Sequence, residues 1–455
     1  MSAMYQHVFL ATWRFGLTFS ASWFLWVLAA GVPPAAAQDS GLDPMISRLV
    51  AEISADRLAA TVDKLASFHT RNTLSSTDHP ALGIGAARQW IFDQFRSFSP
   101  RLEVAFDRHL IAPGGRIPRE TEVVNVMAVL PGRSDRRIYV SGHYDTVVLR
   151  PPPEDSAAAR TFDNFAPGAN DDGSGTALTM ELARVLSQSG LQFEATLVFI
   201  AFAGEEQGLI GARAHAQKAR ADGVRIDAVF NNDIVGNSAG GDGTVDGASV
   251  RVFSEGPEDS PSRQLARYIR RHAARYVPGH EVRLIAREDR FGRGGDHTAF
   301  NQNGYAAVRI TESKENYDRQ HTVRDTPDGV DPRYLAQNAR VNLAAVATLA
   351  LAPPQPVVAG DRGPMLDRGE SRYDARLRWE PSPGAVGYRI FWRDSWSPDW
   401  EHELWVGDVT EYVLPGVSID DHVFGVAAVG PGGHESLVSA YVRPPRPNSP
   451  VPVRR

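Results

Sequence analysis

The chain has 455 residues, which exceeds one ordinary domain and suits one large domain followed by a small one. Hydrophobic residues make up 42% of it and charged residues 22%, the composition of a folded globular protein rather than a disordered one. Because 54 acidic residues outnumber 48 basic ones, the chain lacks the basic excess of nucleic-acid-binding proteins, and we exclude nucleic acid as a partner.

Residues 1–37 have the pattern of a secretory signal peptide. Arg14 precedes an apolar run from Phe15 to Val32, and small residues then lead to Ala37. This order is typical of an exported protein that is cleaved after Ala37. The alternative is an uncleaved N-terminal anchor, because the apolar run approaches the length that spans a bilayer. We expect a secreted or periplasmic protein, with no stable membrane insertion once the signal is removed.

Residues 43–352 alternate between apolar, strand-like segments and helix-like segments. Such alternation predicts an α/β fold: a three-layer α/β/α sandwich with a mixed, largely parallel central sheet. Functional sites in these sheets gather at the carboxyl ends of the strands. The strand-like segments are 137–148, 194–204, 225–233 and 306–313, and the helix-like segments are 174–190 and 208–223.

The C-terminal part of the chain has a different texture. Residues 353–369 are rich in proline and glycine and predict a linker. Residues 370–443 contain short strand-like segments and turns, which predict a small all-β sandwich, and they resemble a fibronectin type III domain around Trp379. We interpret this domain as a spacer, with binding to a surface or a polymer as the alternative. Residues 444–455 predict a disordered tail.

Acidic and histidine residues follow several of the predicted strands. They occur in the segments "GHYDT", "GANDDGSG", "AGEEQG", "NNDIVG" and "DRQHT". The candidate side chains are His143, Asp145, Asp171, Glu205, Glu206, Asp233 and His321. Taken singly, each is more often a helix cap or a solvated surface residue. We expect them to meet at one edge of the sheet.

A chain without cysteine has no disulfide and no thiolate ligand, so a metal ion would be bound by His, Asp and Glu. Imidazole nitrogens and carboxylate oxygens suit zinc, cobalt or manganese. One ligand from each of the five segments gives five ligands, which exceed the needs of one four-coordinate ion and favour two ions that share a bridging carboxylate. Export without cysteine also favours a bacterial source.

The order and spacing of these motifs resemble the co-catalytic zinc aminopeptidases, a family that includes glutamate carboxypeptidases, glutaminyl cyclases and the transferrin receptor ectodomain. The resemblance covers roughly residues 60–350. It implies two Zn²⁺ ions per chain, with Co²⁺ or Mn²⁺ as substitutes. The implied ligand pairs are His143 with Asp233 and Glu206 with His321.

The resemblance also implies the roles of four carboxylates. Asp171 bridges both ions, and Asp145 accepts a hydrogen bond from His143 and so orients its ring. Glu205 is the general base that moves a proton from water to the leaving amine. Asp172 is structural.

The expected function is that of a secreted dizinc exopeptidase, most simply an aminopeptidase that removes N-terminal residues from peptides. A carboxypeptidase or dipeptidase is the alternative, and it requires a cation for the substrate carboxylate, with candidates Arg287, Arg290, Arg293 and Arg309. Glutaminyl cyclisation uses one metal, so a complete ligand set argues against it. A receptor-like binding protein with a relic site would have lost ligands, and none is missing.

Other residues are given structural roles. Asp296 and His297 follow a glycine-rich approach, and we expect them to support the site rather than bind metal. We expect Tyr317, four residues before His321, to have a packing role, with donation of a hydrogen bond to a tetrahedral intermediate as the alternative. His215 and His272 lie in helix-like segments, and we expect both at the surface.

Overall fold

The computed structural model describes residues 41–149 and 162–442. The predicted signal peptide and the predicted tail lie outside the described residues. Within the described part, the helices are all too short or too polar to cross a bilayer.

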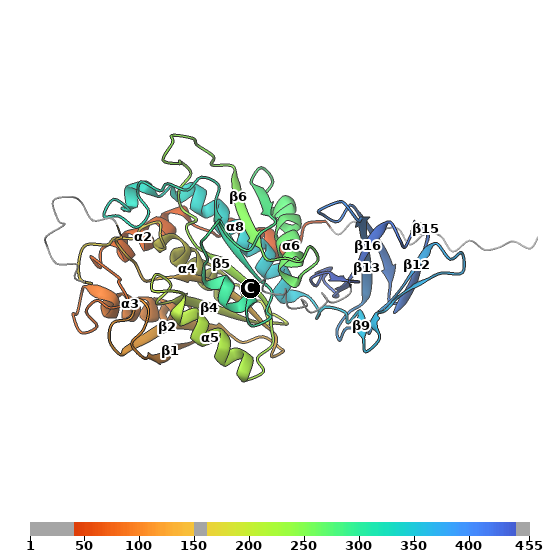
Figure 1. Cartoon of the computed structure of the whole chain (residues 1–455), viewed down its shortest axis with the longest axis horizontal. Helices are drawn as coiled ribbons and strands as arrows, with labels where there is room; N and C mark the ends of the chain where they lie inside the picture. The colour runs from red at the N-terminus through yellow and green to blue at the C-terminus, as the bar shows by residue number, and fades with distance from the viewer. Residues whose placement is uncertain (1–40, 150–161, 443–455) are drawn as a thin grey trace, which may run out of the picture. The chain divides into compact units, whose positions relative to one another are not determined.

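An eight-stranded mixed sheet forms the centre of the large domain (Figure 1). Its strands are β1 (Glu103–Ile111), β2 (Thr121–Leu130), β3 (Arg137–His143), β4 (Thr196–Phe202), β5 (Ile226–Asn232), β6 (Ser249–Ser254), β7 (Glu281–Ile285) and β8 (Ala307–Glu312). Their order across the sheet is β1-β2-β4-β3-β5-β8-β6-β7. The central pairs β4/β3, β3/β5 and β5/β8 are parallel, whereas β1/β2, β2/β4 and β8/β6 are antiparallel. The predicted mixed, largely parallel sheet is confirmed.

Helices cover both faces of this sheet, as the alternation of side chains along β4 shows. Phe199 and Ala201 belong to the apolar core that also contains residues of α4 and α8. Val198 and Ile200 point the other way, into a second core with residues of α5 and α7. A strand buried on both faces is therefore apolar throughout. The helices are α1 (Pro44–Ala51), α2 (Ala55–Ala66), α3 (Gly83–Phe98), α4 (Gly173–Gln188), α5 (Ile210–Ala221), α6 (Pro261–Tyr276), α7 (Asp296–Asn301) and α8 (Pro332–Leu351).

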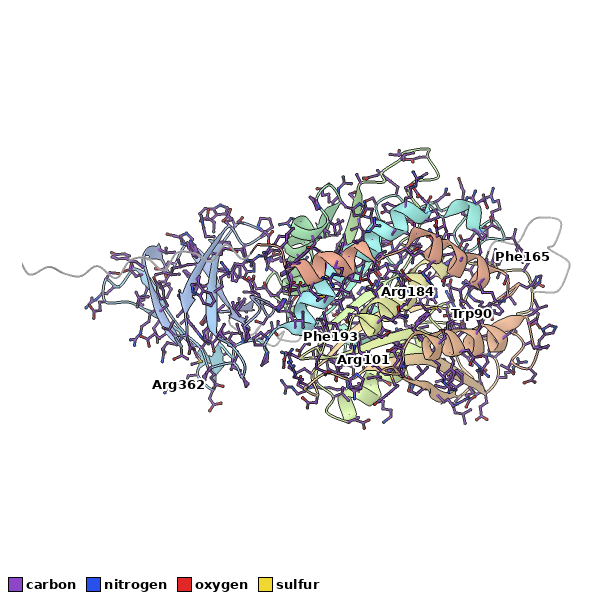
Figure 2. All side chains as sticks on the ribbon, turned by 180° about the vertical axis from the view of Figure 1, so that it is seen from behind. Trp90, Arg101, Phe165, Arg184, Phe193 and Arg362 are labelled. Carbon is purple, nitrogen blue, oxygen red and sulfur yellow. The ribbon has the colours of Figure 1, made fainter. Side chains whose placement is uncertain are left out.

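Arginine side chains satisfy carbonyl groups at helix ends, which have no partner inside their own helix. Arg101 donates to the carbonyl oxygens of Ser187 and Leu191, at and beyond the last turn of α4 (Figure 2). Arg184 donates to the carbonyl oxygen of Glu52, just beyond α1. These contacts hold the helical layer together behind the sheet.

The C-terminal part is all-β, in agreement with the sequence. Its core contains Trp379 and Tyr388, whose ring centroids are 5.3 Å apart. The strands are β9 (Ala359–Gly360), β10 (Gly363–Pro364), β11 (Leu366–Arg368), β12 (Asp374–Arg378), β13 (Gly387–Asp394), β14 (His402–Gly407), β15 (Glu411–Ser418), β16 (His422–Val429) and β17 (Ser439–Ala440). They form three antiparallel sheets, β10-β9, β11-β12-β15 and β14-β13-β16-β17. Because β11 pairs with β12, part of the predicted linker belongs to a sheet; the likeness to fibronectin type III stays a prediction.

Candidate metal centre

The candidate side chains are carried to one place by neighbouring parallel strands. His143 is the last residue of β3, Glu205 and Glu206 follow β4, and Asp233 follows β5. Strands β4, β3 and β5 are adjacent and parallel, so their carboxyl ends meet at one edge of the sheet. Asp171 lies just before α4, and the side chain of His321 reaches the same place from the loop after β8.

Two groups of ligand-type atoms share Asp171. The first consists of His143, Asp171 and Asp233, and the second of Asp171, Glu206 and His321. In each group the three atoms lie within 4.8 Å of one another. The resemblance implied this division and this shared carboxylate, and the structure brings all five side chains together.

The two oxygens of Asp171 face different imidazoles. Its Oδ1 lies 3.2 Å from Nε2 of His143, and its Oδ2 lies 2.9 Å from Nε2 of His321. The same nitrogen of His143 is 3.8 Å from Oδ1 of Asp233, and that of His321 is 3.2 Å from Oε1 of Glu206. One carboxylate thus lies between two half-sites, as a bridging ligand must.

The charges of these groups indicate a cation site. Burial lowers the pKa of His143, but the carboxylates around it, with Glu205 foremost, raise it well above the usual value. Burial likewise opposes the charge of His321, yet Glu206 and Asp171 raise its pKa to about 11. Burial raises the pKa of Glu205 well above normal, because His143 offsets this effect only in part. Without a metal ion, the buried carboxylates hold protons on the imidazoles; a divalent cation can replace those protons.

The donor set fits zinc. Oε1 of Glu206 is buried and accepts no hydrogen bond from the described residues, although Nε2 of His321 is close. A ligand oxygen and a ligand nitrogen that face each other without a hydrogen bond suit a metal ion held by both. Two nitrogens and three carboxylates, with no sulfur, also match the nitrogen and oxygen ligands that zinc accepts.

Asp145 has a wider role than the sequence predicted. Its Oδ1 is 3.5 Å from Nδ1 of His143, and its own backbone oxygen is 3.2 Å from the same nitrogen. Its carboxylate also accepts hydrogen bonds from the backbone N–H groups of Glu205 and Glu206, each at 3.2 Å, and from the hydroxyl of Thr73 at 3.1 Å. One buried carboxylate therefore fixes the histidine and the turn that carries both glutamates.

Asp172 is structural, as expected. It caps α4 by accepting from the N–H of Gly175 at 2.9 Å, and it also accepts from the N–H groups of His143 and Ile234. The peptide bond between Asp171 and Asp172 is cis. A Cβ on Gly175 would lie 2.1 Å from the carbonyl oxygen of Asn232, so this position must be glycine for α4 to approach β5.

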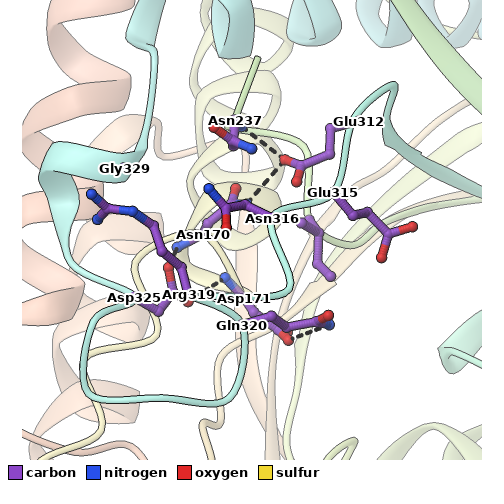
Figure 3. Close-up of a pocket in the computed structure, with 11 residues that line it drawn as sticks. Asn170, Asp171, Asn237, Glu312, Glu315, Asn316, Arg319, Gln320, Asp325 and Gly329 are labelled. Atoms are coloured by element: carbon purple, nitrogen blue, oxygen red, sulfur yellow. Dashed lines mark hydrogen bonds between the residues drawn. The ribbon is translucent and has the colours of Figure 1, made fainter. Parts of the chain in front are cut away.

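The loop around Asp171 is held by polar residues that sequence reasoning missed (Figure 3). Gln320 donates from Nε2 to Oδ2 of Asp171 at 2.9 Å. The carboxylate of Asp325 accepts from the N–H groups of Asn170 and Asp171, at 3.0 and 2.9 Å. Burial raises the pKa of Asp325 to about 7. Gln320 and Asp325 flank His321 in the sequence, and that polar cluster was the available signal.

Arg309 does not face substrate space. It is fully buried, and its Nη1 lies 2.7 Å from Oδ2 of Asp233 and 3.5 Å from Oδ2 of Asp289. Arg290 pairs with Asp289 at 3.0 Å. Because both cations are already paired with carboxylates, Arg309 and Arg290 are unsuited to hold a substrate carboxylate, the role for which they were candidates.

Asp296 and His297 begin α7 and belong to neither of the two metal groups, and their supporting role stays a prediction. Asp296 is buried, and neither of its carboxylate oxygens has a hydrogen-bond partner among the described residues. Burial, with Asp145 adding to it, raises the pKa of Asp296 to about 8. Nε2 of His297 contacts the carbonyl oxygen of Glu288 at 2.9 Å, so this histidine is engaged outside the two metal groups.

A cleft of about 880 Å³ opens beside the centre. Glu205 and His321 form part of its wall, together with Tyr317. Tyr317 is 52% exposed, so the expected packing role is wrong, and the alternative, donation to a tetrahedral intermediate, stays a prediction. Three guanidinium groups also line the cleft, those of Arg116, Arg213 and Arg293.

Solved structures with a similar fold include proteins of Legionella pneumophila, one of them named an aminopeptidase. LapB from Legionella pneumophila superposes with a TM-score of 0.54 at 21% identity, over 69% of this chain and 76% of that one. The LapA aminopeptidase of the same organism gives a TM-score of 0.52 at 21% identity, over 67% and 74% of the two chains. At this level of identity the likeness establishes the fold alone.

Sequence comparison identifies the family. Residues 125–346 match the model of Peptidase family M28. A protein of Pyricularia oryzae named "Probable zinc metalloprotease" is 38% identical over 435 residues, which cover 87% of this chain and 84% of that protein. A protein of the same name from Pyrenophora teres f. teres is 37% identical over 431 residues, covering 87% and 86%. The chain belongs to peptidase family M28.

Proposed function

We propose that this protein is a zinc-dependent exopeptidase that removes residues from the N-termini of peptides. The observation that carries the proposal is the sharing of Asp171 between two His and carboxylate groups beside an open cleft. Membership of family M28 and relatives named zinc metalloproteases support peptide hydrolysis and zinc.

We assign the ligands as two sets with one member in common. His143 and Asp233 would hold one Zn²⁺ ion, Glu206 and His321 would hold the other, and Asp171 is the residue that both groups share. When bound, zinc lowers the pKa of water and polarises a carbonyl group, and Co²⁺ or Mn²⁺ can take its place.

The chain's own residues supply orientation and proton transfer. Glu205 is half-buried at the cleft wall, where it takes a proton from the attacking water and delivers it to the leaving amine. Asp145 holds the backbone of Glu205 and the ring of His143, so base and ligand keep one geometry. Asp145 is thus a positioning residue.

A carboxypeptidase or dipeptidase is the second candidate, favoured by the three arginines of the cleft. Arg116 donates to the carbonyl oxygen of Glu206 at 2.7 Å, and Arg293 donates to Oε1 of Gln320 at 3.0 Å. Arg213 is exposed on α5 and faces the same cleft. A guanidinium group here would suit a substrate carboxylate.

Mass spectrometry of incubated peptides separates the candidates. Peptides with free and with acetylated N-termini are incubated with the protein, with and without a chelator, and with zinc restored afterwards. Stepwise loss of residues from free N-termini alone, abolished by the chelator and restored by zinc, is the expected result. Shortening of acetylated peptides from the C-terminus would replace the aminopeptidase assignment with carboxypeptidase. No cleavage despite bound zinc would point to a narrower peptide specificity or to a binding role.

We also propose that the protein is exported, on the basis of the sequence of residues 1–37 alone. N-terminal sequencing of the protein from its source should give a sequence that begins at Gln38.

For the C-terminal sheets we propose a stabilising role. Arg393 donates hydrogen bonds of 2.9 and 2.8 Å to Asp259, just before α6, and Arg271 of α6 pairs with Glu403 and Glu435. The C-terminal part thus contacts α6 and the segment before it through ion pairs.

A further inference from the structure

A second cluster of ligand-type side chains lies outside the candidate metal centre, between the edge strand β1 and helix α5. Asp107 and His109 are two residues apart on β1, so their side chains lie on the same face of the strand. His215 approaches that face from α5. Sequence reasoning placed His215 at the surface, as it did His272; both are buried, so that expectation is wrong.

The three side chains converge on a single carboxylate oxygen. Oδ2 of Asp107 lies 2.9 Å from Nε2 of His109 and 2.9 Å from Nδ1 of His215. These three atoms lie within 4.8 Å of one another, as the atoms of each of the two Asp171-centred groups do. In the Asp171-centred groups the nitrogen–oxygen distances are 2.9 to 3.8 Å. The edge cluster is therefore as compact as the centre that we assign to zinc.

The surroundings of the cluster resemble those of metal-bound histidines. The far nitrogen of His215, Nε2, lies 3.2 Å from the hydroxyl oxygen of Tyr139, and such outer partners fix the tautomer and orientation of a ligating ring. Asn125 donates to Oδ2 of Asp107 at 2.8 Å and holds the carboxylate in place. Burial alone would raise the pKa of Asp107, but hydrogen bonds from His109 and His215 outweigh it and hold that pKa well below its usual range.

The cluster is also accessible from solvent. The side chains of His109, Asp107 and His215 are 13%, 15% and 11% exposed. An ion can therefore enter, and water can complete a four-coordinate site with two nitrogens and one oxygen from the protein.

We propose that Asp107, His109 and His215 bind a further divalent transition-metal ion of the zinc class, separate from the Asp171-centred groups. Imidazole with one carboxylate suits Zn²⁺ or Cu²⁺ and not Mg²⁺ or Ca²⁺, which prefer oxygen ligands. The ion joins α5 to β1. Since α5 begins four residues after Glu206, it supports the turn that carries Glu205 and Glu206.

Zinc analysis of the whole protein tests this site, with Zn²⁺ itself as the probe. After equilibration with zinc and removal of the excess, His109→Gln is expected to contain one zinc equivalent fewer than the wild type. Asp107→Asn, which keeps the side-chain size, is expected to lose the same equivalent. His79→Gln is the matched control, because His79 is exposed and belongs to none of the metal groups. Unchanged zinc content in both cluster variants would overturn the proposal.

A second measurement separates a metal site from a purely hydrogen-bonded triad. Unfolding temperatures are measured for stripped proteins before and after zinc is added, because a ligand that binds only the folded state stabilises it. The rise in unfolding temperature on addition of zinc should be smaller in His109→Gln than in the wild type. An equal increment in both proteins would mean that the triad is held by hydrogen bonds alone.

The two metal proposals fail independently. His321→Gln, which changes a ligand of the catalytic assignment, should lose catalytic zinc and keep the equivalent bound near His109. If only His321→Gln loses zinc, the catalytic assignment stands and the site at His109 is rejected. If only His109→Gln loses zinc, the site at His109 stands and the catalytic assignment is rejected.

Discussion

Nη1 of Arg309 lies 2.7 Å from Oδ2 of Asp233, and the guanidinium group is fully buried. The other carboxylate oxygen, Oδ1, is the one that approaches His143. Arg309 thereby selects which oxygen of Asp233 faces the centre. An ion pair that orients a ligand in this way affects metal affinity although the arginine contacts no metal.

Replacing Arg309 by glutamine should weaken zinc binding. Loss of such an outer partner lowers metal affinity by about 10–100-fold, because the ligand is no longer held in its binding orientation. Competition with a chromophoric chelator measures this change. Arg283→Gln, on the exposed surface of β7, is the control and should bind zinc as the wild type does. Equal affinities in both variants would show that Asp233 needs no such partner.

Replacing Glu205 by glutamine should abolish most turnover while the metal content stays unchanged. A general base contributes about 10²–10⁴-fold to the rate, and glutamine keeps the shape of the side chain without its proton affinity. Initial rates and zinc content are measured on the same preparation. Glu122→Gln on β2 is a surface control. Turnover near that of the wild type would remove Glu205 from the role of base.

The fold could be predicted because its signals are local. β4 is apolar at every position, since both of its faces are covered, and α5 follows a strand within a few residues. The edge strand β1 was not among the predicted strands. Its side chains, from Glu103 to Ile111, are all exposed or half-exposed, so the segment lacks the apolar run that marks a buried strand. The short strands β9 to β11 could not be found either, because each has only two or three residues and they lie in a segment rich in proline and glycine.

The candidate site was predictable as far as its residues end strands. His143, Asp233 and the two glutamates follow β3, β5 and β4 directly, so the topology alone brings them together. The partners of these residues could not be read from the sequence. Arg309 lies inside β8, and its pairing with Asp233 arises only because β5 and β8 are neighbours. Burial of His215 likewise depends on where α5 packs.

Arg213→Gln distinguishes the two exopeptidase assignments. If the protein is an aminopeptidase, the change in KM should be the same for peptides with a free and with an amidated C-terminus. An exposed ion pair contributes about 0.2–1 kcal/mol, so we expect Arg213→Gln to change KM by less than about sixfold for either peptide. Arg220→Gln, also exposed on α5 and outside the cleft, is the control. A larger increase in KM for peptides with a free C-terminus than for amidated peptides would favour the carboxypeptidase assignment.

Asp289→Asn should destabilise the metal-free protein in a pH-dependent manner. Burial raises the pKa of Asp289, but Arg309, His297 and Arg290 outweigh it and hold that pKa well below its usual value. The carboxylate is thus more easily ionised in the folded state than in the unfolded chain. Its contribution is fully present above the unfolded pKa, about 3.9, and is lost as the pH falls through the folded value.

Near neutral pH this variant should lose about 3–5 kcal/mol of unfolding free energy, because Arg309 and Arg290 lose a buried partner. The difference from the wild type should stay constant down to about pH 5 and narrow below about pH 4. Urea unfolding with a chelator present measures it at each pH. Asp135→Asn, at a site 78% exposed, should show no comparable loss. A difference that is the same at every pH would mean that Asp289 stabilises the fold through its shape and hydrogen bonds rather than through its charge.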